Sequence, residues 1–519
     1  MKLLARLLLV AVLPLLAHCA SAPQLEGVVP SHAIAPAHTS VIDRAVLRQF
    51  GDDPTVSSVR LVEENAMAFA YRAATAAAAE RTLDVQYYIW HEDLTGKLLA
   101  AELVRAAERG VRVRVLIDDL DARDKHDLFA IADLHPNIEV RMFNPFYSRS
   151  GVLGYWTELL LRASHLNHRM HNKAWIADNR VAIIGGRNIG DEYFGASPHS
   201  NFSDLDVALT GPIVADVSRQ FDEYWNCQHA VPVSRFDSRQ PEPEALGQMV
   251  EAARQYREDV ADTPYVTALR DVQKRSELLA AASPPVLVHD VRLLVDDPGQ
   301  LRDKEKLSDS RVLAGLNEAI TGAQREVLIV SPYFVPGKAG AQSLVDDVAR
   351  GLRVAVLTNS LAATDVAAVH TGYARVRRGL LRGGVELYEM KRRAGSEHGR
   401  RQISVTGSSR ASLHSKALLI DDRWVYVGSM NLDPRSAILN TEMGVLVDSP
   451  ALARQLHAQW DLITSPELSY RVALEEDGEL VWYDHAGGRE RRSQHEPDAS
   501  WGRRTSVTLL RLLPIESQL

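Results

Sequence analysis

His171–Asp178 reads HNKAWIAD and His414–Asp421 reads HSKALLID, and this repeated stretch decides the fold. In both copies Lys follows His by two residues, Asp follows Lys by five, and an asparagine (Asn188 or Asn431) follows Asp by ten. One such His-x-Lys-x4-Asp match arises by chance in about two chains of this composition in a hundred. Two copies in the same register therefore indicate an internal duplication.

The sequence around each copy repeats one plan of secondary structure. In the first half the β-branched and aromatic run Leu83–Trp90 precedes a helical pattern and the apolar run Val111–Ile117. In the second half Val327–Val335 precedes a helical pattern and Leu352–Leu357. Strands that alternate with helices of this length predict βαβ units in a parallel or mixed sheet. The offset of 243 residues between the two histidines indicates a two-copy duplication and not a solenoid.

These patterns divide the chain into six parts. We expect a signal segment, a flexible tether, a first α/β half, a connector or insertion packed on that half, a second α/β half and a C-terminal extension. Their bounds are 1–19, 20–45, 46–235, 236–310, 311–470 and 471–519.

The N-terminus has the layout of a secretory signal. Lys2 and Arg6 precede the apolar run Leu7–Leu16, which is too short to span a bilayer comfortably. Residues 16–19 (LAHC) resemble the lipobox of bacterial lipoproteins, in which the cysteine is diacylated, although His18 departs from the usual small residue. We therefore predict a lipid on Cys19. The alternative, a buried N-terminal helix, is disfavoured by this layout.

A lipid on Cys19 predicts a location in the bacterial cell envelope. The protein would be a membrane-anchored lipoprotein that faces the periplasm. Ala20 is not the aspartate that retains enterobacterial lipoproteins in the inner membrane, so outer-membrane sorting is a weaker, second inference. No later segment holds 18 uninterrupted apolar residues.

The composition is that of an ordinary globular protein. Of 519 residues, 46% are hydrophobic and 24% charged, which excludes collagen-like, coiled-coil and disordered classes. The net charge of −8 gives no overall electrostatic match to nucleic acid, and two cysteines make no disulfide scaffold. There is no Walker loop, Gly-x-Ser-x-Gly or His-Glu-x-x-His, so NTPase, serine-hydrolase and zinc-protease chemistry have no support.

The repeated motif carries residues suited to a phosphate diester. Residues two apart on a strand point the same way, so His414 and Lys416 project together, as do His171 and Lys173. Each following strand ends in a glycine turn that presents an asparagine. The set supplies a nitrogen nucleophile and several donors for phosphoryl oxygens. A surface His beside a Lys is the alternative for one copy, and the presence of both copies disfavours it.

The duplicated motif, with its trailing Gly-[Gly/Ser]-x-Asn, resembles the signature of the phospholipase D superfamily. The resemblance covers roughly residues 46–466, and within the superfamily the chain looks most like bacterial cardiolipin synthases, particularly the C-type branch. Supporting segments are Gly185–Asp191, Asn431–Ser436 and Leu513–Glu516. The resemblance implies two α/β halves, each a mixed sheet flanked by helices, related by a pseudo-twofold axis. One active site lies between them.

The resemblance also implies roles for the motif residues. One histidine attacks phosphorus and forms a phosphohistidine, while the other protonates the leaving alcohol and then deprotonates the incoming hydroxyl. We assign the nucleophile to His171 and the acid/base to His414, because the family's N-terminal histidine is usually the nucleophile. The phosphoryl oxygens are assigned to Lys173, Lys416, Asn188 and Asn431.

Acidic and hydroxyl residues complete the expected site. Glu442 matches the family's acidic partner of a histidine ring, and Asp206 is the expected partner of His171. Ser429 is a further possible donor, replaced by glycine in the first half. Asp178 and Asp421 belong to the catalytic motif but alternate out of phase with its His and Lys, so we expect them to fix a turn.

Two weaker features leave alternatives open. Basic residues from Arg375 to Arg410 are either a surface for anionic lipid headgroups or a solvated face, and the sequence favours neither. Residues 505–513 (TSVTLLRLL) form either a packed C-terminal element, which we favour, or an amphipathic membrane-facing helix.

The resulting hypothesis is a phosphatidyltransferase that makes cardiolipin from phosphatidylglycerol and a second phospholipid, phosphatidylethanolamine or phosphatidylglycerol. The first alternative is a hydrolytic phospholipase D or phosphodiesterase that releases phosphatidic acid. The second is a non-catalytic lipid-binding lipoprotein. We expect phospholipid substrates in a membrane, no nucleic acid, no cofactor and no metal, since no carboxylate cluster offers an oxygen cage.

Overall fold

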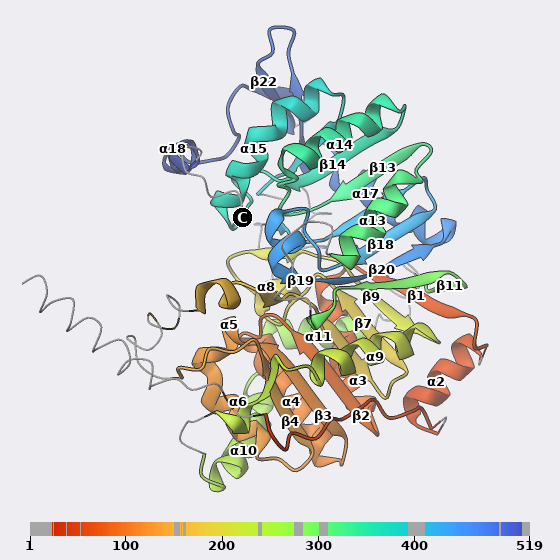
Figure 1. The fold of residues 1–519 in the computed structure, drawn as a ribbon, viewed down its shortest axis with the longest axis vertical. Coiled ribbons are helices and arrows are strands. Elements are labelled where there is room, and N and C mark those ends of the chain that lie inside the picture. The colour runs from red at the N-terminus through yellow and green to blue at the C-terminus, as the bar shows by residue number, and fades with distance from the viewer. Residues whose placement is uncertain are drawn as a thin grey trace, which may run out of the picture.

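The computed structural model describes residues 23–510, except 24, 38, 52, 150–155, 157, 159–161, 237–240, 275–283, 300–309, 393–410 and 487–488. Two large mixed β-sheets fill the lower and upper parts of the molecule, and helices cover the outer face of each (Figure 1). Cys19 lies outside the described residues. Among the described residues, no helix is both long and apolar enough to cross a membrane.

The first sheet has the strand order β10-β4-β3-β2-β6-β7-β9-β1-β11. Strands β2, β3 and β4 are parallel, and β6, β7, β9 and β1 continue antiparallel from β2. The strands are β1 (Ser57–Val62), β2 (Thr82–Tyr87), β3 (Arg112–Asp118), β4 (Ile138–Phe143), β6 (Ala174–Ala177), β7 (Val181–Gly185), β9 (Asp206–Thr210), β10 (Ala230–Pro232) and β11 (Val286–Val288). The helices of this half are α2 (Val41–Phe50), α3 (Asn65–Ala78), α4 (Leu94–Glu108), α5 (Asp119–Ala122), α6 (His126–Asp133), α8 (Asp191–Phe194) and α9 (Ile213–Trp225).

The second sheet has the order β12-β20-β18-β17-β13-β14-β15-β21-β22-β23. Its strands are β12 (Val291–Val295), β13 (Glu326–Val330), β14 (Arg353–Asn359), β15 (Glu386–Met390), β17 (Ala417–Ile420), β18 (Trp424–Gly428), β20 (Met443–Asp448), β21 (Ser469–Leu474), β22 (Leu480–Ala486) and β23 (Arg489–Ser493). The helices are α13 (Arg311–Thr321), α14 (Gly337–Ala349), α15 (Ala367–Arg382), α17 (Pro450–Ile463) and α18 (Trp501–Leu510), and a π-helix spans Arg435–Leu439.

The two sheets confirm the predicted duplication. The order β4-β3-β2-β6-β7-β9 in the first sheet corresponds to β15-β14-β13-β17-β18-β20 in the second, with the same parallel and antiparallel pairings. Each motif histidine precedes the strand that pairs antiparallel with the first parallel strand, β6 beside β2 and β17 beside β13. The α/β class with two tandem halves is therefore confirmed.

One hydrophobic core joins the two halves. It contains side chains of both sheets, such as Ile184 and Val427, together with Trp225 of α9 and Trp460 of α17. Separate cores lie under the outer helices of each half. Because each fully buried large apolar side chain contributes about 1.5–3 kcal/mol, the shared core fixes the halves against one another.

Two short pairs of strands cross between the halves and fix the site. β5 (Arg169–Met170) pairs parallel with β19 (Asn440–Thr441), and β8 (Asn201–Ser203) pairs parallel with β16 (Ala411–Leu413). In each pair, the strand that leads into a motif histidine lies beside a strand of the other half that leads into an acidic residue. The arrangement is therefore symmetric about the pseudo-twofold axis.

The connector differs in part from the expectation. Helices α10 (Glu244–Asp259) and α11 (Pro264–Lys274) contact α4 and α3, and β11 adds to the edge of the first sheet. Strand β12, in contrast, pairs with β20 in the second sheet. The expectation that the whole connector packs on the first half is wrong here, because the chain crosses to the second half before α13.

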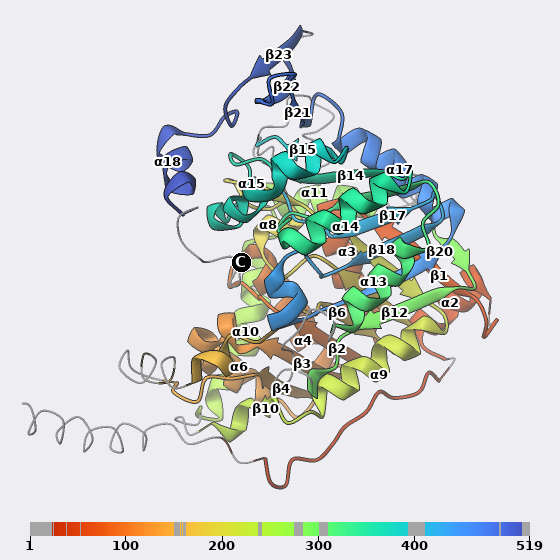
Figure 2. The same ribbon diagram turned by 45° about the horizontal axis from the view of Figure 1, so that its top comes forward.

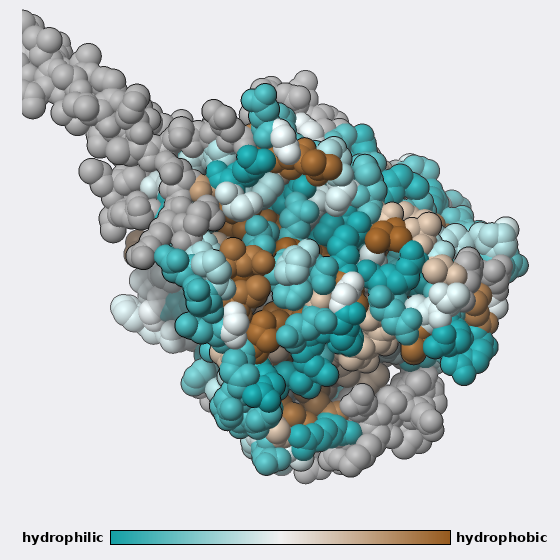
Figure 3. All heavy atoms as spheres, turned by 90° about the horizontal axis from the view of Figure 1, so that it is seen from below, coloured by the Kyte–Doolittle hydropathy of each residue, from teal (hydrophilic) through white to brown (hydrophobic). Residues whose placement is uncertain are grey.

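The described part of the C-terminal extension adds β21, β22 and β23 to the edge of the second sheet and then forms α18 (Figure 2). From below, the surface of the molecule is mostly hydrophilic with small separate hydrophobic patches (Figure 3).

Candidate active site

Each motif histidine is bound by a carboxylate from the other half. His171 Nδ1 lies 2.8 Å from Glu442 Oε2, and His414 Nδ1 lies 2.5 Å from Asp204 Oδ2. The crossing strands set this geometry, since the His171 N–H donates to the Thr441 carbonyl at 2.9 Å and the His414 N–H donates to the Ser203 carbonyl at 2.8 Å. All four side chains are buried. Because a carboxylate only accepts, each Nδ1 carries a proton and each Nε2 is left for chemistry.

The expected pairing of Asp206 with His171 is wrong. Asp206 lies at the start of β9 and accepts a hydrogen bond from Arg72 at 2.9 Å, while Arg187 lies 3.4 Å away. The neighbouring acid, Asp204, binds a histidine instead, and that histidine is His414. The pairing crosses between halves because β8 carries Asp204 to β16.

The two carboxylates that bind the histidines differ in length, since Glu442 has one methylene group more than Asp204. The residues beside each carboxylate differ as well. Ser429 Oγ donates to Glu442 Oε2 at 2.5 Å and accepts from the Met443 N–H, so it supports the carboxylate. Gly186 takes the matching place in the first half. A Cβ there would lie 2.2 Å from Asp204 Oδ1, so the shorter Asp204 occupies the space that Ser429 fills in the second half.

The two motif lysines lie beside their histidines. Lys416 Nζ is 3.1 Å from His414 Nε2 and 3.0 Å from Nδ1, and it donates to the His414 carbonyl at 2.5 Å. Lys173 Nζ donates to the His171 carbonyl at 2.7 Å. Both side chains are only 1% exposed. Lys416 thus lies beside the Nε2 atom of His414, and burial lowers the pKa of Lys173 well below its ordinary value.

The two motif asparagines have different surroundings. The Asn188 amide donates to Tyr193 Oη at 3.0 Å and accepts from the Ile89 N–H at 3.3 Å, so it positions a tyrosine beside the site. Asn431 is 5% exposed, and its Oδ1 has no hydrogen-bond partner among the described residues.

Asp178 and Asp421 do not reach the histidines, which corrects their place among the catalytic residues. The Asp178 carboxylate accepts hydrogen bonds from the backbone N–H groups of Glu80, Arg81 and Thr82, where β2 begins. Asp421 does the same at the start of β13, with the N–H groups of residues 324–326. Both aspartates have positive φ, 51° and 56°. They fix the turn, as the alternation of the strand predicts.

Burial and neighbouring cations set the protonation of the site. Burial, with the charges of Lys173 and Lys416, lowers the pKa of His171 well below its ordinary value. Burial and Lys416 also lower the pKa of His414, against the opposing effect of Asp204. Burial lowers the pKa of Lys416 to about 8. His414 in turn holds the pKa of Asp204 below its ordinary value, so this carboxylate stays charged. His171 is therefore neutral at pH 7, whereas the charge of Asp204 favours the protonated form of His414.

Aromatic rings that the sequence analysis did not single out line the site. Tyr88 lies edge-on to His171, with ring centroids 5.1 Å apart, and Lys173 Nζ is 5.5 Å from the Tyr88 ring. Tyr193 and Phe202 contact the His414 ring, at 5.2 Å and 4.9 Å. Tyr88 belongs to the run of the first parallel strand, but its pattern gives no signal that it turns toward His171.

A second set of missed residues supports the acids from behind. Asp296 Oδ2 accepts from the Glu442 N–H at 3.1 Å, and Asp118 accepts from the Met170 N–H at 2.9 Å. Burial raises the pKa of Asp118 to about 6. These aspartates lie in ordinary strand or loop contexts, so nothing in the sequence distinguishes them.

Some basic residues of the stretch before His414 form ion pairs within the protein. Arg377 is buried and binds Glu389 and Glu496, each at 2.8 Å, and Lys391 pairs with Asp484. Residues 393–410 are outside the described part of the chain. The described members that form these ion pairs are not a lipid-binding surface.

Two groups in the described part of the chain could hold a metal ion. They are His91, Asp93 and Glu192, and Glu326, Asp422 and His457. Neither group contains a motif residue.

A buried pair of histidines, each held by a carboxylate of the opposite half and flanked by a lysine, defines a phosphodiester-transfer site of the phospholipase D type. Residues 73–225 and 316–463 match the family described as "Cardiolipin synthase, PLD-like domain". The chain belongs to this family, and it is an enzyme of the phosphatidyltransferase type.

Known proteins similar to this chain agree with this assignment. Cardiolipin synthase C of Escherichia coli (strain K12) is 40% identical over 473 residues, which are 91% of this chain and 98% of that protein. Cardiolipin synthase B of the same strain is 28% identical over 369 residues, 71% of each chain. The crystal structure of phosphatidylserine synthase from Haemophilus influenzae Rd KW20 covers 89% of this chain and 95% of that chain, with a TM-score of 0.56 and 15% identity. The last comparison shows the shared fold.

Proposed function

We propose that this protein makes cardiolipin by transferring the phosphatidyl group of one phospholipid to phosphatidylglycerol. The donor is phosphatidylethanolamine or a second phosphatidylglycerol. The observation that carries the proposal is the shared site, in which a carboxylate of the opposite half binds the Nδ1 atom of each histidine. The 40% identity to a cardiolipin synthase over nearly its whole length supports the choice of product.

In the proposed first step, His171 Nε2 attacks phosphorus. A nitrogen–phosphorus bond forms as the bond to the headgroup alcohol breaks, and His414 begins this step as an imidazolium and donates its Nε2 proton to the leaving oxygen. The lowered pKa of His171 keeps its ring neutral and nucleophilic. Glu442 stabilises the positive charge that develops on this ring, and the two lysines neutralise the phosphoryl oxygens.

In the second step, His414 takes the proton of the phosphatidylglycerol hydroxyl. The oxygen attacks phosphorus, the nitrogen–phosphorus bond breaks, and His171 is restored. Asp204 stabilises the imidazolium form of His414, which exists before the first step and again after the second. If water takes the place of the acceptor, the same intermediate gives phosphatidic acid, which is the product of the alternative function.

Mixed vesicles with labelled phosphatidylethanolamine, with and without phosphatidylglycerol, test the proposal. We expect cardiolipin as the main product and phosphatidic acid as a minor one, because an acceptor confined to the same bilayer has a high effective concentration. The His171→Ala variant is the matched inactive control. Dominant phosphatidic acid at abundant phosphatidylglycerol would identify a hydrolase, and no product in either mixture would identify a lipid-binding protein.

We further propose that the mature protein is a lipoprotein of the bacterial envelope, anchored through Cys19. The signal-like residues 1–19 and the phospholipid substrates support this location. Mass spectrometry of the membrane-extracted protein is expected to show a diacylglyceryl group on Cys19, and Cys19→Ser is expected to release the protein from the membrane. An unmodified mature N-terminus would reject the proposal.

A further inference from the structure

We propose that the protein docks on the bilayer through a face made of α5, the segment 361–367 and α18, with Trp501 and Leu509 of α18 entering the lipid. Elements of this docking face lie close to both His171 and His414, so docking would bring the site to the membrane surface. The inference rests on the proposed function in one respect, that the substrates are phospholipids held in a bilayer.

Large apolar side chains are exposed on each part of the docking face. In α18, Trp501 is 81% exposed and Leu509 is 61% exposed. Leu120 of α5 is 48% exposed, and Val366 in the segment 361–367 is 40% exposed. Exposed apolar side chains on neighbouring elements mark an interaction surface more clearly than single ones do.

The exposed and packed residues of α18 lie on different sides of the helix. Val507 is 3% exposed and packs with Ala499, Leu361 and Ala362. At about 100° per residue, Trp501 and Leu509 lie about 80° apart, while Val507 is about 160° from Leu509. The helix is therefore held on the protein by one side and presents tryptophan and leucine on the other, the pattern of an interfacial helix.

The segment under α18 reaches the His414 side of the site. The Arg503 guanidinium donates to the Thr364 carbonyl. The next residue, Asp365, accepts from Tyr333 Oη at 2.6 Å, and its charge acts on both His414 and Lys416. Asp365, which follows the residue bound by Arg503 of α18, therefore lies near enough to His414 for its charge to raise the pKa of that histidine.

On the other half, α5 reaches the His171 side in the same way. Asp118 caps α5 and accepts from the Met170 N–H, one residue before His171. Asp121 of α5 accepts from the Trp90 N–H at 2.9 Å. The exposed Leu120 lies between these two aspartates. Both catalytic histidines thus have an exposed apolar side chain on an element close behind them.

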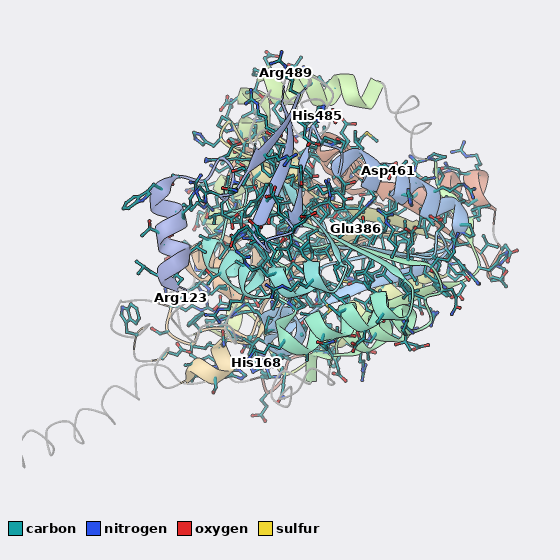
Figure 4. All side chains as sticks on the ribbon, turned by 90° about the horizontal axis from the view of Figure 1, so that it is seen from above. Arg123, His168, Glu386, Asp461, His485 and Arg489 are labelled. Atoms are coloured by element: carbon teal, nitrogen blue, oxygen red, sulfur yellow. The ribbon has the colours of Figure 1, made fainter. Side chains whose placement is uncertain are left out.

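The views agree on the side of the molecule. Helix α18 lies at the left edge in Figures 1, 2 and 4, and Arg123, which follows α5, lies on that side in Figure 4. Strand β11 lies at the opposite edge in Figure 1.

A bilayer fits this face better than a protein does. The side chains of His171 and His414 are only 9% and 7% exposed, so a lipid headgroup has to be lifted to them while its acyl chains remain in the membrane. A protein bound at this face would stand between the site and that membrane. Tryptophan also has a known preference for the level of the headgroups.

A double variant, Trp501→Ser with Leu509→Ser, tests the proposal in the full chain. With phosphatidylglycerol in vesicles we expect kcat/KM to fall about tenfold or more, because the variant lacks the two apolar side chains that enter the bilayer. With monomeric dihexanoyl-phosphatidylglycerol we expect less than a twofold change. Leu287→Ser is the matched control, because Leu287 is 55% exposed on β11, at the other edge, and its loss is expected to change neither activity.

Equal activity of the double variant and the wild type on vesicles would overturn the proposal, as would an equal loss on both substrates, which indicates damage to the site. A mass that drops from dimer to monomer in the double variant, with vesicle turnover unchanged, would assign the face to a second copy of this chain.

Fluorescence provides a readout that needs no turnover. Quenching by vesicles of brominated phosphatidylglycerol is expected to be stronger in the wild type than in Trp501→Phe, and the difference reports Trp501 alone. Equal quenching would overturn the insertion of Trp501. A wild type that is quenched but converts no phospholipid would contradict the proposed function and leave the docking face in place.

Discussion

At the scale of single residues, the two histidines depend on carboxylates that differ in length. Glu442 is steadied by the hydroxyl of Ser429, whereas Asp204 fits only because position 186 is glycine. Each histidine therefore has a carboxylate partner, but the two carboxylates are held in place by different neighbours.

Gly186→Ala tests this asymmetry. The new Cβ would lie 2.2 Å from Asp204 Oδ1, so Asp204 has to move away from His414. We expect kcat to fall about 10–100-fold through the loss of the histidine's partner, and the protein to lose about 1–3 kcal/mol of stability through overpacking. Gly247→Ala is the control, since nothing lies within 4 Å of its added Cβ. Full activity in Gly186→Ala would show that the Asp204 contact is dispensable.

The pH profile follows from the lysine beside His414. Lys416, with a pKa of about 8, carries the charge that binds the phosphoryl group, and that charge is lost as the pH rises through this value. The lowered pKa of His171 keeps the nucleophile neutral at pH 6.5 and above. We expect kcat/KM, which reports the free enzyme, to be flat near neutral pH and to fall above about pH 8. Lys416→Arg is expected to be slower and to shift this alkaline fall without removing it, because burial also lowers the pKa of Lys173 well below its ordinary value. A wild-type profile that stays flat to pH 9.5 would contradict the assignment.

Which carboxylate binds which histidine could not be predicted from the sequence. The spacing identified the histidines, lysines and asparagines, because they share one motif and one strand pattern. The spacing could not show that Asp204, and not Asp206, binds a histidine, because one residue separates the two acids. The choice depends on how the first half packs against the second. The aromatic residues Tyr88, Tyr193 and Phe202 carry no motif at all.

At the scale of elements, the alternation of strands and helices predicted both sheets, because long apolar runs such as β3 and β14 have few alternatives. The crossing strands β5, β8, β16 and β19 were not predicted, since each has only two or three residues and forms by contact with the other half. These short strands carry the histidines to their partners. The position of β12, a strand of five residues, was missed because it depends on pairing with β20 of the second half.

Each motif aspartate fixes the start of a parallel strand, Asp178 that of β2 and Asp421 that of β13. Asp178→Asn replaces a carboxylate that accepts three backbone N–H groups, and we expect a loss of about 2–4 kcal/mol, seen as a lower urea midpoint. At permissive temperature the folded variant is expected to keep most of its kcat. Asp421→Asn is expected to cost less, because Asp421 is more exposed than Asp178. A well-folded but inactive Asp178→Asn protein would return this residue to the catalytic set.

At the scale of the whole molecule, the shared core and the crossing strands make one site from two copies of a fold. The proposed mechanism assigns the phosphoryl oxygens to lysine and asparagine side chains and gives no step to a metal ion. We expect exhaustive chelation to leave kcat/KM within about twofold of the untreated value. Inactivation that one specific metal reverses would point to the His91 or His457 group as a site that the reaction requires.

In the proposed mechanism the two halves share one reaction, through a covalent bond between phosphorus and His171. The most direct test is to mix the enzyme with phosphatidylglycerol labelled at phosphorus, quench in alkali within milliseconds and locate the label by mass spectrometry. We predict a phosphohistidine on the peptide that contains His171, absent from His171→Ala, and no turnover in either His171→Ala or His414→Ala. Label on His414, or rapid product formation with no labelled histidine, would contradict the account.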